Sequence, residues 1–298
     1  MKNDLQDVSE ALAGLVETAA ASVVHVHARR RIGSSGVVWS NDGLVVTADH
    51  AVEIEDEISA TLPSGESAPA RLVGRDPGTD LAVLRLEASG LTPPQWSGDG
   101  AVRPGQIVLG VLRSPRTHRA SLGIVGAAGG EWRAPAGGRL ERYLETTLPL
   151  QPGFSGSLLL DAGGSGLGMN TTGLLRGMAG AVPHAALRRV VEALLAHGTI
   201  RRGYLGIGTY PVRLSTAAAR QTGQETGLIV LSVQPDSPAE KAGLTQGDVL
   251  IALDGRPTAH VGELHALLDE ESVGREVAAR IARAGAVEER RLTVGARG

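Results

Sequence analysis

Short apolar runs alternate with turn-forming residues along the first two thirds of the chain. Between residues 22 and 185 the runs include SVVHVHA, SGVVWS, GLVVTA, ISATLP, LAVLRLE, QIVLGVL, SLGIVGAA, SLLLD and GLGMNTT. The segments between them include SNDG, LPSGE, GRDPG and DAGGSG, which carry the Gly, Pro, Asn and Asp that turns need. Strands of this length and spacing are typical of β-sandwiches and β-barrels, so the pattern predicts a mainly β unit.

Two segments have helical periodicity instead. In HAALRRVVEALLAHG, residues 184–198, apolar residues repeat at intervals of three and four, and Gly198 stands where a C-cap is expected. Residues 1–24 have the spacing of a short amphipathic helix that leads into a strand. We expect the helix at 184–198 to close the first domain.

The strand pattern restarts after residue 201. Strand-like YLGIGTYPV and GLIVLSV lead to SPAEKAGL, a short helix with Ser237 as N-cap and Pro238 at its first position. The strand GDVLIALDG, the helix VGELHALLDE and the strand EERRLTV follow. We therefore expect two domains, residues 1–201 and 202–298, the second of which combines β-strands with two helices.

Composition narrows the classes of protein that fit this pattern. A chain of 298 residues with 41 glycines and 2% aromatic residues suits turn-rich β domains packed by aliphatic side chains. The absence of cysteine excludes disulfides, thiolate catalysis and cysteine-ligated zinc. A net charge of −3 gives no electrostatic basis for binding nucleic acid or an anionic membrane. No run reaches the roughly 18 apolar residues of a membrane-spanning helix.

The first residues bear on the compartment. MKNDLQDVSEALAGLVETAAASVV lacks the basic start and the compact apolar block of a signal peptide. If Met1 is the native start, we expect a cytoplasmic protein. If a leader was removed and a methionine added, we expect the periplasm or another extracytoplasmic compartment.

The stretch LQPGFSGSLLLD at residues 150–161 brackets one serine with glycines. Gly153 lies two residues before Ser155, and Gly156 follows it. One interpretation is a tight turn that leads into a core strand. The other is that the glycines let the N–H groups of Gly153 and Ser155 converge beside a serine nucleophile, where an oxyanion would form. These residues alone favour the turn, so a choice between the two interpretations depends on motifs elsewhere in the chain.

Two further motifs supply what a serine nucleophile needs, a histidine base and a carboxylate that orients it. In GLVVTADHAV, His50 follows the end of a predicted strand. In GRDPGTDLAVLRLE, Asp80 precedes an almost wholly apolar strand, where burying a carboxylate is costly unless it has a partner. Asp49 is a poor substitute because it adjoins His50. The alternatives are a surface-loop histidine and a turn-capping aspartate.

Another pair of histidines raises the question of a metal. His25 and His27 lie two residues apart on one face of a predicted strand. Such a pair can bind a metal, but no third ligand stands nearby in the sequence. We expect no metal site and no organic cofactor.

Several segments resemble the successive signatures of the HtrA/Deg (high-temperature-requirement) serine proteases. They are SSGVVWSNDGLVVTADHAV, LPSGESAPARLVGRDPGTDLAVLRLE, GFSGS, LGMNT and HGTIRRGYLGIG, and the resemblance runs from about residue 8 to the C-terminus. It implies a mainly β fold, a chymotrypsin-like double β-barrel followed by one PDZ domain (a β-sandwich with two helices). It also implies His50 as general base, Asp80 as orienting carboxylate and Ser155 as nucleophile. The oxyanion hole would use the N–H groups of Gly153 and Ser155, with that of Phe154 as a further donor.

The chain departs from the family around the nucleophile. The family usually has Asn before the serine and two glycines after it, where this chain has Phe154, Gly156 and Ser157. Phe154 removes a polar side chain from the oxyanion loop. Ser157 adds a Cβ where the chain normally makes its tightest pass, which costs more if its φ is positive. Both changes bear on activity more than on the fold.

The segment before the nucleophile bears on substrate choice. TLPLQ at 147–151 contains no acidic residue, so specificity for Arg or Lys is not expected. A small or medium aliphatic residue before the scissile bond is the expectation, consistent with the family. Leu150 and Gln151 would line the substrate site. The substrate backbone would pair with the strand edge formed by Asn170, Thr171 and Thr172.

The segment GYLGIG resembles the carboxylate-binding loop of PDZ domains. Its residues Tyr204, Leu205, Gly206 and Ile207 would cradle the C-terminal carboxylate of a hydrophobic peptide with backbone N–H groups. The peptide would add as a strand, and the helix VGELHALLDE would form the other wall of the groove. The alternative is a hydrophobic cluster in a hairpin, which explains the leucines but not the glycines.

The resemblance implies an ATP-independent serine endopeptidase of protein quality control and stress response. It would cleave unfolded or misfolded polypeptides and be regulated or targeted by its PDZ domain. The alternative is a catalytically silent pseudo-protease that binds unfolded chains through that domain, supported by Phe154 and Ser157. An esterase would more often show Gly-x-Ser-x-Gly between a strand and a helix. The family also implies a homotrimer, although no aromatic residue precedes Trp39.

Overall fold

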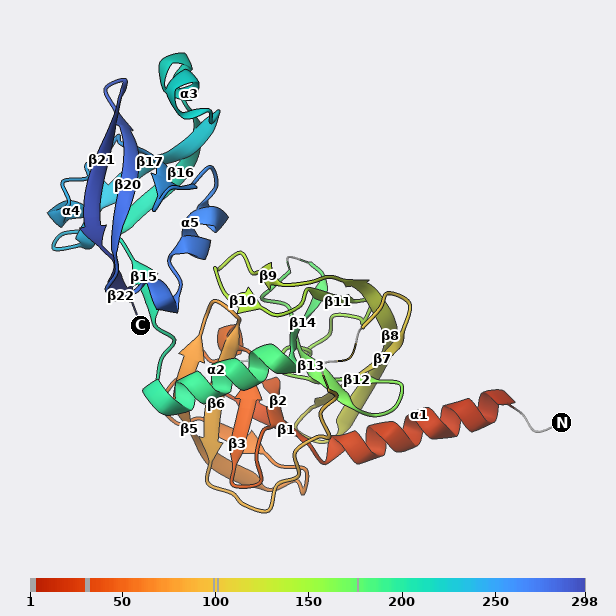
Figure 1. The fold of residues 1–298 in the computed structure, drawn as a ribbon. Coiled ribbons are helices and arrows are strands. Elements are labelled where there is room, and N and C mark those ends of the chain that lie inside the picture. The colour runs from red at the N-terminus through yellow and green to blue at the C-terminus, as the bar shows by residue number, and fades with distance from the viewer. Residues whose placement is uncertain (1–3, 30–32, 99, 101, 176, 298) are drawn as a thin grey trace. The chain divides into compact units, whose positions relative to one another are not determined.

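The computed structural model describes residues 4–29, 33–98, 100, 102–175 and 177–297. The chain forms two compact units, Met1–Thr199 and Ile200–Gly298. This division falls two residues before the boundary expected between residues 201 and 202. Figure 1 shows the helices and strands of each unit.

Six antiparallel strands of the first unit close into a barrel (Figure 1). In spatial order they are β1 (Val23–His27), β2 (Ser34–Val38), β3 (Leu44–Thr47), β6 (Leu81–Leu86), β5 (Ser67–Asp76) and β4 (Ser59–Thr61). Their core includes Val24, Val45 and Leu84, and every buried member of it is aliphatic. The low aromatic content of the chain is thus reflected directly in how this barrel is packed.

A second closed barrel follows in the same unit. In spatial order its strands are β11 (Leu144–Thr146), β14 (Ala179–Pro183), β13 (Gly166–Thr171), β12 (Leu158–Asp161), β7 (Ile107–Arg113) and β8 (His118–Ala128). A short hairpin, β9 (Trp132–Arg133) with β10 (Arg139–Leu140), lies between β8 and β11 in the chain. The predicted strand SLLLD is β12, which pairs with β7 on one side and β13 on the other. Because β12 begins three residues after Ser155, the barrel anchors that serine.

Helix α2 (His184–His197) coincides with the helix predicted at 184–198 and packs against strands of both barrels (Figure 1). Leu187, Val190 and Leu194 form part of its buried face. Gly198 ends the helix with a φ of 72°, and its N–H donates to the Leu194 carbonyl oxygen. The periodic pattern therefore located both the buried face and the cap.

Helix α1 (Asp4–Ala20) is the amphipathic helix predicted at the N-terminus, and it leads into β1. Its buried residues, Ala19 and Ala20, lie in its last turn, whereas Leu5 and Val8 are exposed. None of the helices in the described residues is long and apolar enough to cross a membrane.

The second unit is built on one sheet and a two-stranded ribbon. The sheet has the order β16 (Ile207–Arg213), β17 (Thr226–Val233), β18 (Val249–Leu253), β20 (Glu276–Arg283) and β21 (Ala286–Thr293), with β19 (Arg256–Pro257) beside β18. The ribbon pairs β15 (Arg202–Tyr204) with β22 (Gly295–Arg297). Strand β16 is at an edge of the sheet, a position where a peptide can add as a further strand.

Helices of the second unit are α3 (Thr216–Thr222), α4 (Pro238–Lys241) and α5 (Val261–Leu267), followed by the 3-10 turn η2 (Glu270–Ser272). The predicted helices correspond to α4 and α5, and α4 has Ser237 as its N-cap. Helix α3 was not predicted, because TAAARQT has no apolar periodicity. Its caps were readable nevertheless: the Ser215 side chain accepts a hydrogen bond from the Ala218 N–H, and Gly223 ends the helix.

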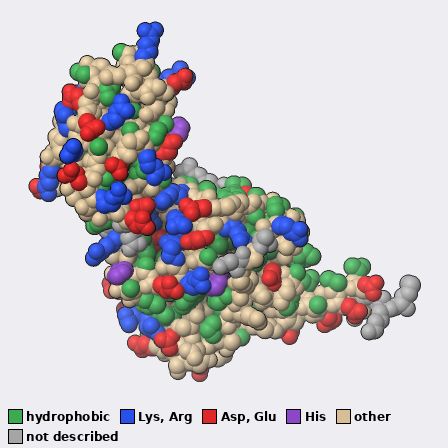
Figure 2. All heavy atoms as spheres, viewed as in Figure 1, with side chains coloured by type: hydrophobic (Ala, Val, Ile, Leu, Met, Phe, Trp, Pro, Cys, Tyr) green, Lys and Arg blue, Asp and Glu red, His purple; other side chains and the backbone are tan. Residues whose placement is uncertain are grey.

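Charged side chains of both signs are mixed on the surface. On the face shown in Figure 2, basic and acidic groups lie side by side on each unit. Ion pairs at the surface of the chain include that of Arg85 with Asp42, at 2.6 Å between Nη1 and Oδ2. The described residues on this face therefore present no continuous basic surface of the kind that nucleic-acid-binding proteins use.

Candidate active site

His50 and Asp80 meet where neighbouring strands of the first barrel begin and end. Strand β3 ends at Thr47, and the 3-10 turn η1 (Asp49–Ala51) carries His50 beyond it. Asp80 precedes β6, which pairs with β3. The His50 Nδ1 atom lies 2.8 Å from Asp80 Oδ2, and the His50 backbone N–H donates to Asp80 Oδ1 at 3.0 Å. This pairing assigns the ring proton to Nδ1 and leaves Nε2 as a proton acceptor.

The Asp80 carboxylate is buried, with hydrogen-bond donors around it. The Thr171 hydroxyl donates to Oδ2, in addition to the two bonds from His50. Gly173 approaches so closely that a Cβ added to it would overlap the carboxylate. These hydrogen bonds offset the free-energy cost of burying a charge. Sequence reasoning expected Thr171 to contact substrate, and the structure instead makes it a support of Asp80.

The neighbouring carboxylate, Asp49, has a different partner. The Arg75 Nε–H donates to Asp49 Oδ1, and Arg75 Nη2 donates to the Asp49 backbone oxygen at 3.2 Å. Burial raises the pKa of the Asp49 carboxyl, and the hydrogen bond from Arg75 opposes that rise. Asp49 therefore holds the turn that carries His50, while Asp80 is the carboxylate that reaches the ring.

Two consecutive β-turns precede and include Ser155. The first covers residues 151–154 and is closed by a 2.9 Å backbone hydrogen bond; the second covers 154–157 and is closed at 3.0 Å. Gly153 and Gly156, the third residues of the two turns, both have a φ of 84°. A third residue with positive φ is what a type II turn requires, and glycine adopts it without strain. The glycines around Ser155 therefore form turns, as the simpler interpretation expected.

The same turns leave two backbone N–H groups without a backbone acceptor. Among the described residues, no backbone oxygen accepts a hydrogen bond from the N–H of Gly153 or Ser155. Both groups are thus available to an oxyanion. The Phe154 N–H, expected as a further donor, already donates to the Gln151 carbonyl oxygen, so it does not belong to this set.

Ser35, at the start of β2, joins the first barrel to the Ser155 turns. Its N–H donates to the Ser155 carbonyl oxygen at 3.1 Å, and its hydroxyl donates to the Gly153 carbonyl oxygen at 2.8 Å. The Arg113 N–H donates to the same hydroxyl at 3.0 Å. A Cβ added to Gly156 would overlap the Ser35 carbonyl oxygen. Sequence reasoning missed Ser35, because no local pattern indicates a contact across more than a hundred residues of chain.

The departures at Phe154 and Ser157 have a different consequence from the expected one. The Phe154 side chain is 3% exposed and packs in the core of the second barrel beside residues such as Leu148 and Leu159. Ser157 is also buried, and its φ is not positive. Its hydroxyl accepts a hydrogen bond from Asn170 Nδ2 at 3.0 Å. The tightest approach is at Gly156, so the expected cost at Ser157 does not arise.

Models of two protein families match the chain. Residues 34–169 match the trypsin-like peptidase domain, and residues 203–294 match the PDZ domain. A probable periplasmic serine endoprotease DegP-like of Marinomonas sp. (strain MWYL1) is 32% identical over 270 residues, which are 88% of this chain and 57% of that protein. One of Brucella suis biovar 1 (strain 1330) is 33% identical over 278 residues, 91% of this chain and 54% of that protein. The chain spans about half the length of these curated relatives.

Solved structures agree with these matches. The HtrA-type protease AlgW with decapeptide has a TM-score of 0.74 at 25% identity, covering 96% of this chain and 98% of its own. The chain belongs to the HtrA/Deg family. The serine endoprotease from Yersinia pestis, with a TM-score of 0.74 at 27% identity and the same two coverages, supports the assignment. The expected double β-barrel followed by a PDZ domain is thereby confirmed.

In this HtrA/Deg family member, Thr172 lies between Ser155 and the His50 ring that Asp80 holds. Ser155 Oγ lies 3.2 Å from Thr172 Oγ1, which lies 3.4 Å from His50 Nε2. The structure therefore brings His50, Asp80 and Ser155 to one place, at the junction of the two barrels.

The other residues expected to bind substrate differ in their surroundings. Leu150 is 45% exposed, and Gln151 donates from Nε2 to the Ser121 hydroxyl at 2.6 Å. Asn170 is fully buried, and its backbone N–H and C=O are bonded to Ser157 and to the neighbouring Gly156. Asn170 therefore cannot offer a strand edge to a peptide, because β13 lies inside the barrel between β12 and β14. Thr172, just past the end of β13, is partly exposed.

The candidate carboxylate loop of the PDZ unit runs from β15 into the edge strand β16. Gly206 has a φ of 81°, and a Cβ added to it would overlap the Ser237 side chain. In the described part of the chain, no backbone oxygen accepts a hydrogen bond from the Leu205 or Gly206 N–H. The Leu205 side chain is buried in the core, and the Tyr204 hydroxyl bonds to the Gln234 side chain.

The two elements expected to flank a bound peptide, helix α5 and strand β16, lie next to each other. Helix α5 contacts strand β16, and Ile207 and Val261, one from each element, are partly buried against the core of the unit. Two N–H groups at the end of an apolar groove can hold a carboxylate while the groove takes the last side chain of a peptide.

His25 and His27 each bond to a neighbouring strand. His25 Nδ1 donates to the Arg113 carbonyl oxygen at 3.0 Å, and His27 Nε2 lies 3.0 Å from the Thr61 hydroxyl. Burial lowers the pKa of the His25 imidazole below its ordinary 6.5. No group of three or more His, Cys, Asp or Glu side chains suited to a metal ion occurs among the described residues.

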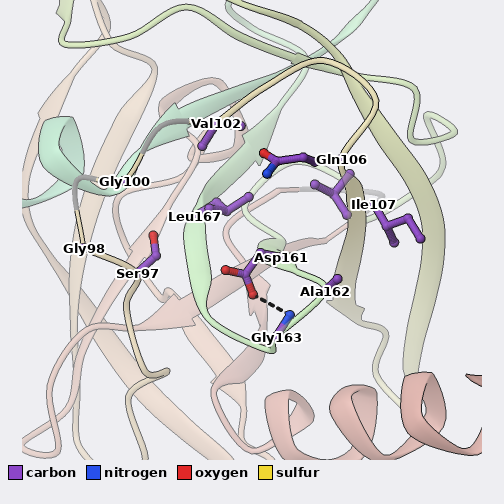
Figure 3. A pocket seen from close by; sticks show the side chains of 11 residues that line it. Ser97, Gly98, Gly100, Val102, Gln106, Ile107, Asp161, Ala162, Gly163 and Leu167 are labelled. Atoms are coloured by element: carbon purple, nitrogen blue, oxygen red, sulfur yellow. Dashed lines mark hydrogen bonds between the residues drawn. The ribbon is translucent and has the colours of Figure 1, made fainter.

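A cavity of about 400 Å³ is lined by residues of the second barrel and of the segment that precedes β7 (Figure 3). Its lining includes Ser97, Gln106, Asp161 and Leu167, and no residue of the triad. Asp161 Oδ1 accepts a hydrogen bond from the Gly163 N–H at 2.8 Å, so its carboxylate serves the turn between β12 and β13 (Figure 3). The cavity is not part of the candidate active site.

Proposed function

We propose that this chain is a serine endopeptidase that hydrolyses peptide bonds through an acyl-enzyme. The observation that carries the proposal is the His50–Asp80 pair, with Nε2 left as an acceptor, beside a serine whose turns leave two N–H groups without a backbone partner. The DegP-like relatives are described as serine endoproteases, which supports the same reaction.

The reaction follows from these positions. His50 Nε2 accepts the Ser155 hydroxyl proton as Oγ bonds to the carbonyl carbon of the substrate. The carbonyl oxygen becomes an oxyanion held by the N–H groups of Gly153 and Ser155. Protonated His50 then gives its proton to the amide nitrogen as the carbon–nitrogen bond breaks. A water molecule, deprotonated by His50, attacks the ester, and Ser155 Oγ leaves with the proton from His50.

Asp80 keeps His50 in the correct tautomer throughout. Its carboxylate holds the Nδ1 proton and stabilises the imidazolium that forms in each half of the reaction. Thr171 and the His50 backbone N–H fix the carboxylate in turn. Catalysis therefore needs no metal or organic cofactor in this proposal.

We further propose that the substrates are unfolded or misfolded polypeptides, cleaved without ATP after small or medium aliphatic residues. Leu150, five residues before the nucleophile, is exposed, and no acidic residue lies in the segment 147–151. The DegP-like relatives are described as periplasmic, so we propose that compartment, with a role in quality control and stress response. No comparison supports the cytoplasmic alternative. A homotrimer stays a prediction.

The PDZ unit is proposed to bind the C-termini of peptides and to regulate or target the protease. The unpartnered N–H groups of Leu205 and Gly206, at the start of an edge strand, support a carboxylate site. The AlgW structure is described with a bound decapeptide, in agreement with peptide recognition in the family.

The pseudo-protease alternative rested on Phe154 and Ser157. Both side chains are buried away from the Ser155 hydroxyl, in the core of the second barrel and against Asn170. The active peptidase is therefore the better-supported proposal.

Degradation of a permanently unfolded protein, in buffer without ATP, tests the proposed peptidase. We expect the wild type to produce peptides and Ser155→Ala to produce none. Mass spectrometry of the products gives the residue before each cleaved bond. Cleavage mainly after Arg or Lys would contradict the proposed specificity, and equal degradation by Ser155→Ala would contradict the proposed nucleophile.

Calorimetric titration tests the PDZ proposal separately. A peptide with a free hydrophobic C-terminus should bind, whereas the same peptide with an amidated C-terminus should bind at least about tenfold more weakly, since a charge-assisted hydrogen bond is lost. Equal affinity for the two peptides would exclude a carboxylate site at Leu205 and Gly206.

A further inference from the structure

The Thr172 hydroxyl lies between the nucleophile and the base. Its Oγ1 is 3.2 Å from Ser155 Oγ and 3.4 Å from His50 Nε2. The Thr172 backbone N–H donates to Ser155 Oγ at 3.3 Å. Within the described chain, no hydrogen bond joins Ser155 Oγ directly to His50. A third side chain therefore occupies the contact on which proton transfer depends.

The direction of each hydrogen bond follows from the His50 tautomer. Because Nδ1 carries the proton shared with Asp80, Nε2 accepts, and the Thr172 hydroxyl donates to it. The Thr172 oxygen then accepts the Ser155 proton. Ser155 Oγ itself accepts the Thr172 N–H. Ser155 thus directs its proton to the Thr172 hydroxyl oxygen, which is a much weaker base than imidazole. In addition, the Thr172 N–H binds a lone pair of Ser155 Oγ that is needed for attack on the substrate.

We propose that Thr172 is a positioning residue that holds the Ser155 hydroxyl away from His50 until a peptide substrate is bound. The inference rests on the proposed peptidase function. It concerns the side chain of Thr172 alone, which stands just beyond the last residue of β13 and is partly exposed.

The arrangement is weak enough to be reversed by a substrate. Distances of 3.2 and 3.4 Å are longer than the roughly 2.7–2.8 Å of a strong hydroxyl hydrogen bond. Rotation of Thr172 about its Cα–Cβ bond removes the hydroxyl from between the two groups. A peptide lying beside the end of β13 offers a carbonyl oxygen to the Thr172 N–H, which then no longer donates to Ser155 Oγ. Ser155 is then released toward His50 Nε2.

Labelling rates of three proteins test this role. A small fluorophosphonate makes no strand contacts, so it meets the resting arrangement of Ser155. Wild type, Thr172→Val and Thr172→Ser are incubated with it, and the second-order rate constant of adduct formation is measured by intact mass. Valine keeps the shape and the backbone N–H of residue 172 but removes the hydroxyl, whereas serine keeps the hydroxyl.

We expect Thr172→Val to be labelled about two- to tenfold faster than the wild type, which corresponds to the loss of one neutral hydrogen bond. Thr172→Ser should keep the wild-type rate within about twofold. Hydrolysis of an extended peptide substrate should change much less in kcat/KM, because the peptide itself displaces Thr172. If Thr172 merely supported the fold, Thr172→Val would slow both labelling and hydrolysis. Melting curves of the three proteins would then show a loss of stability.

The outcomes separate the two proposals. Labelling of the wild type at Ser155 without any acceleration in Thr172→Val overturns the role of Thr172 alone. Slower labelling of Thr172→Val, with normal labelling of Thr172→Ser, also overturns it, since the hydroxyl would then be needed for proton transfer. No labelling of Ser155 in any of the three folded proteins, with or without a peptide that has a free hydrophobic C-terminus, overturns the proposed peptidase function and this inference with it.

Discussion

The two barrels of the protease unit hold their parts of the site by different means. The first barrel supplies the ionisable groups, His50 and Asp80, which are held by side-chain hydrogen bonds around a buried carboxylate. The second supplies Ser155 and its backbone donors, which are held by two turns with glycine at positive φ. A buried carboxylate is stable only with several hydrogen-bond donors around it, whereas these backbone N–H groups are left without an internal acceptor by unusual backbone angles.

Each barrel also fixes the part of the site that the other supplies. Thr171 of the second barrel donates to the Asp80 carboxylate of the first. Ser35 of the first barrel donates to the carbonyl oxygens of Gly153 and Ser155 in the second. The site is therefore complete only when the two barrels are docked.

The largest effect on activity is expected from a substitution in the first barrel, which supplies His50 and Asp80. Asp80→Asn keeps the size of the side chain but no longer fixes the Nδ1 proton of His50, so kcat/KM on a peptide should fall by roughly 10³- to 10⁴-fold. Asp49→Asn is the matched control, because Asp49 bonds to Arg75 and not to the ring. Peptide hydrolysis by both variants is the measurement. Equal losses would show that Asp80 has no special role.

Substitution of a turn glycine in the second barrel should lower both activity and stability. Gly156→Ala imposes a left-handed φ on alanine and drives its Cβ into the Ser35 carbonyl oxygen. We expect the free energy of unfolding to fall by about 2–4 kcal/mol, and fluorophosphonate labelling to slow by on the order of 100-fold.

Gly105→Ala isolates the contribution of φ in that experiment. Gly105 has a φ of 89° with open space around the position of a Cβ. Its substitution should cost only about 1–2 kcal/mol and leave labelling unchanged. If urea unfolding gave the two variants the same stability, the close contact with Ser35 would carry no weight.

The contact between the barrels should give a smaller effect. Ser35→Ala removes the hydroxyl that bonds to Gly153 O and to the Arg113 N–H. We expect a loss of about 1–3 kcal/mol in unfolding free energy and a fall in kcat of about tenfold, as the turns lose one restraint. Ser34→Ala, whose hydroxyl faces Thr47, is the control. A larger fall in kcat for Ser34→Ala would contradict the role given to Ser35.

The smallest effect is expected on the pH dependence of stability, through the hydrogen bond between His25 of the first barrel and Arg113 of the second. Burial lowers the pKa of the His25 imidazole, which donates to Arg113 O. The unfolded chain therefore binds more protons below about pH 6.5, and the free energy of unfolding falls as the pH drops below that value. His25→Asn keeps a donor and should reduce this slope by at most about 1.4 kcal/mol per pH unit.

The comparison for that slope is an exposed histidine. His118→Asn, on β8, replaces an imidazole that has no buried contact to lose. Urea unfolding at several pH values between 5 and 7 measures all three proteins. A slope unchanged by His25→Asn would exclude His25 as a source of the acid sensitivity.

Local signals allowed the sequence to locate the main parts of the site. His50 and Asp80 stand at predicted strand ends, and Ser155 stands between glycines before a buried strand. The cap of α2 at Gly198 was likewise a local signal, and it was found at the expected residue. These features depend on neighbours in the chain, so patterns of a few residues are enough to indicate them.

The remaining parts depend on contacts between distant segments. Ser35 lies 118 residues from Gly153, and Thr171 lies 91 residues from Asp80, so no local pattern indicates either contact. Asn170 was expected at a strand edge, but the order of strands in the closed barrel places it inside. Phe154 was interpreted as part of the oxyanion loop, although the packing of the second barrel buries its ring.

The most direct test of the whole account is covalent labelling of the assembled site. Wild type and Ser155→Ala are incubated with a fluorophosphonate, weighed intact and then mapped by peptide mass spectrometry. We expect one adduct on the wild type, located on Ser155, and none on Ser155→Ala. A wild type that stays unlabelled even with a PDZ-binding peptide present, or an adduct that persists in Ser155→Ala, would contradict the claim that the two barrels together activate this serine.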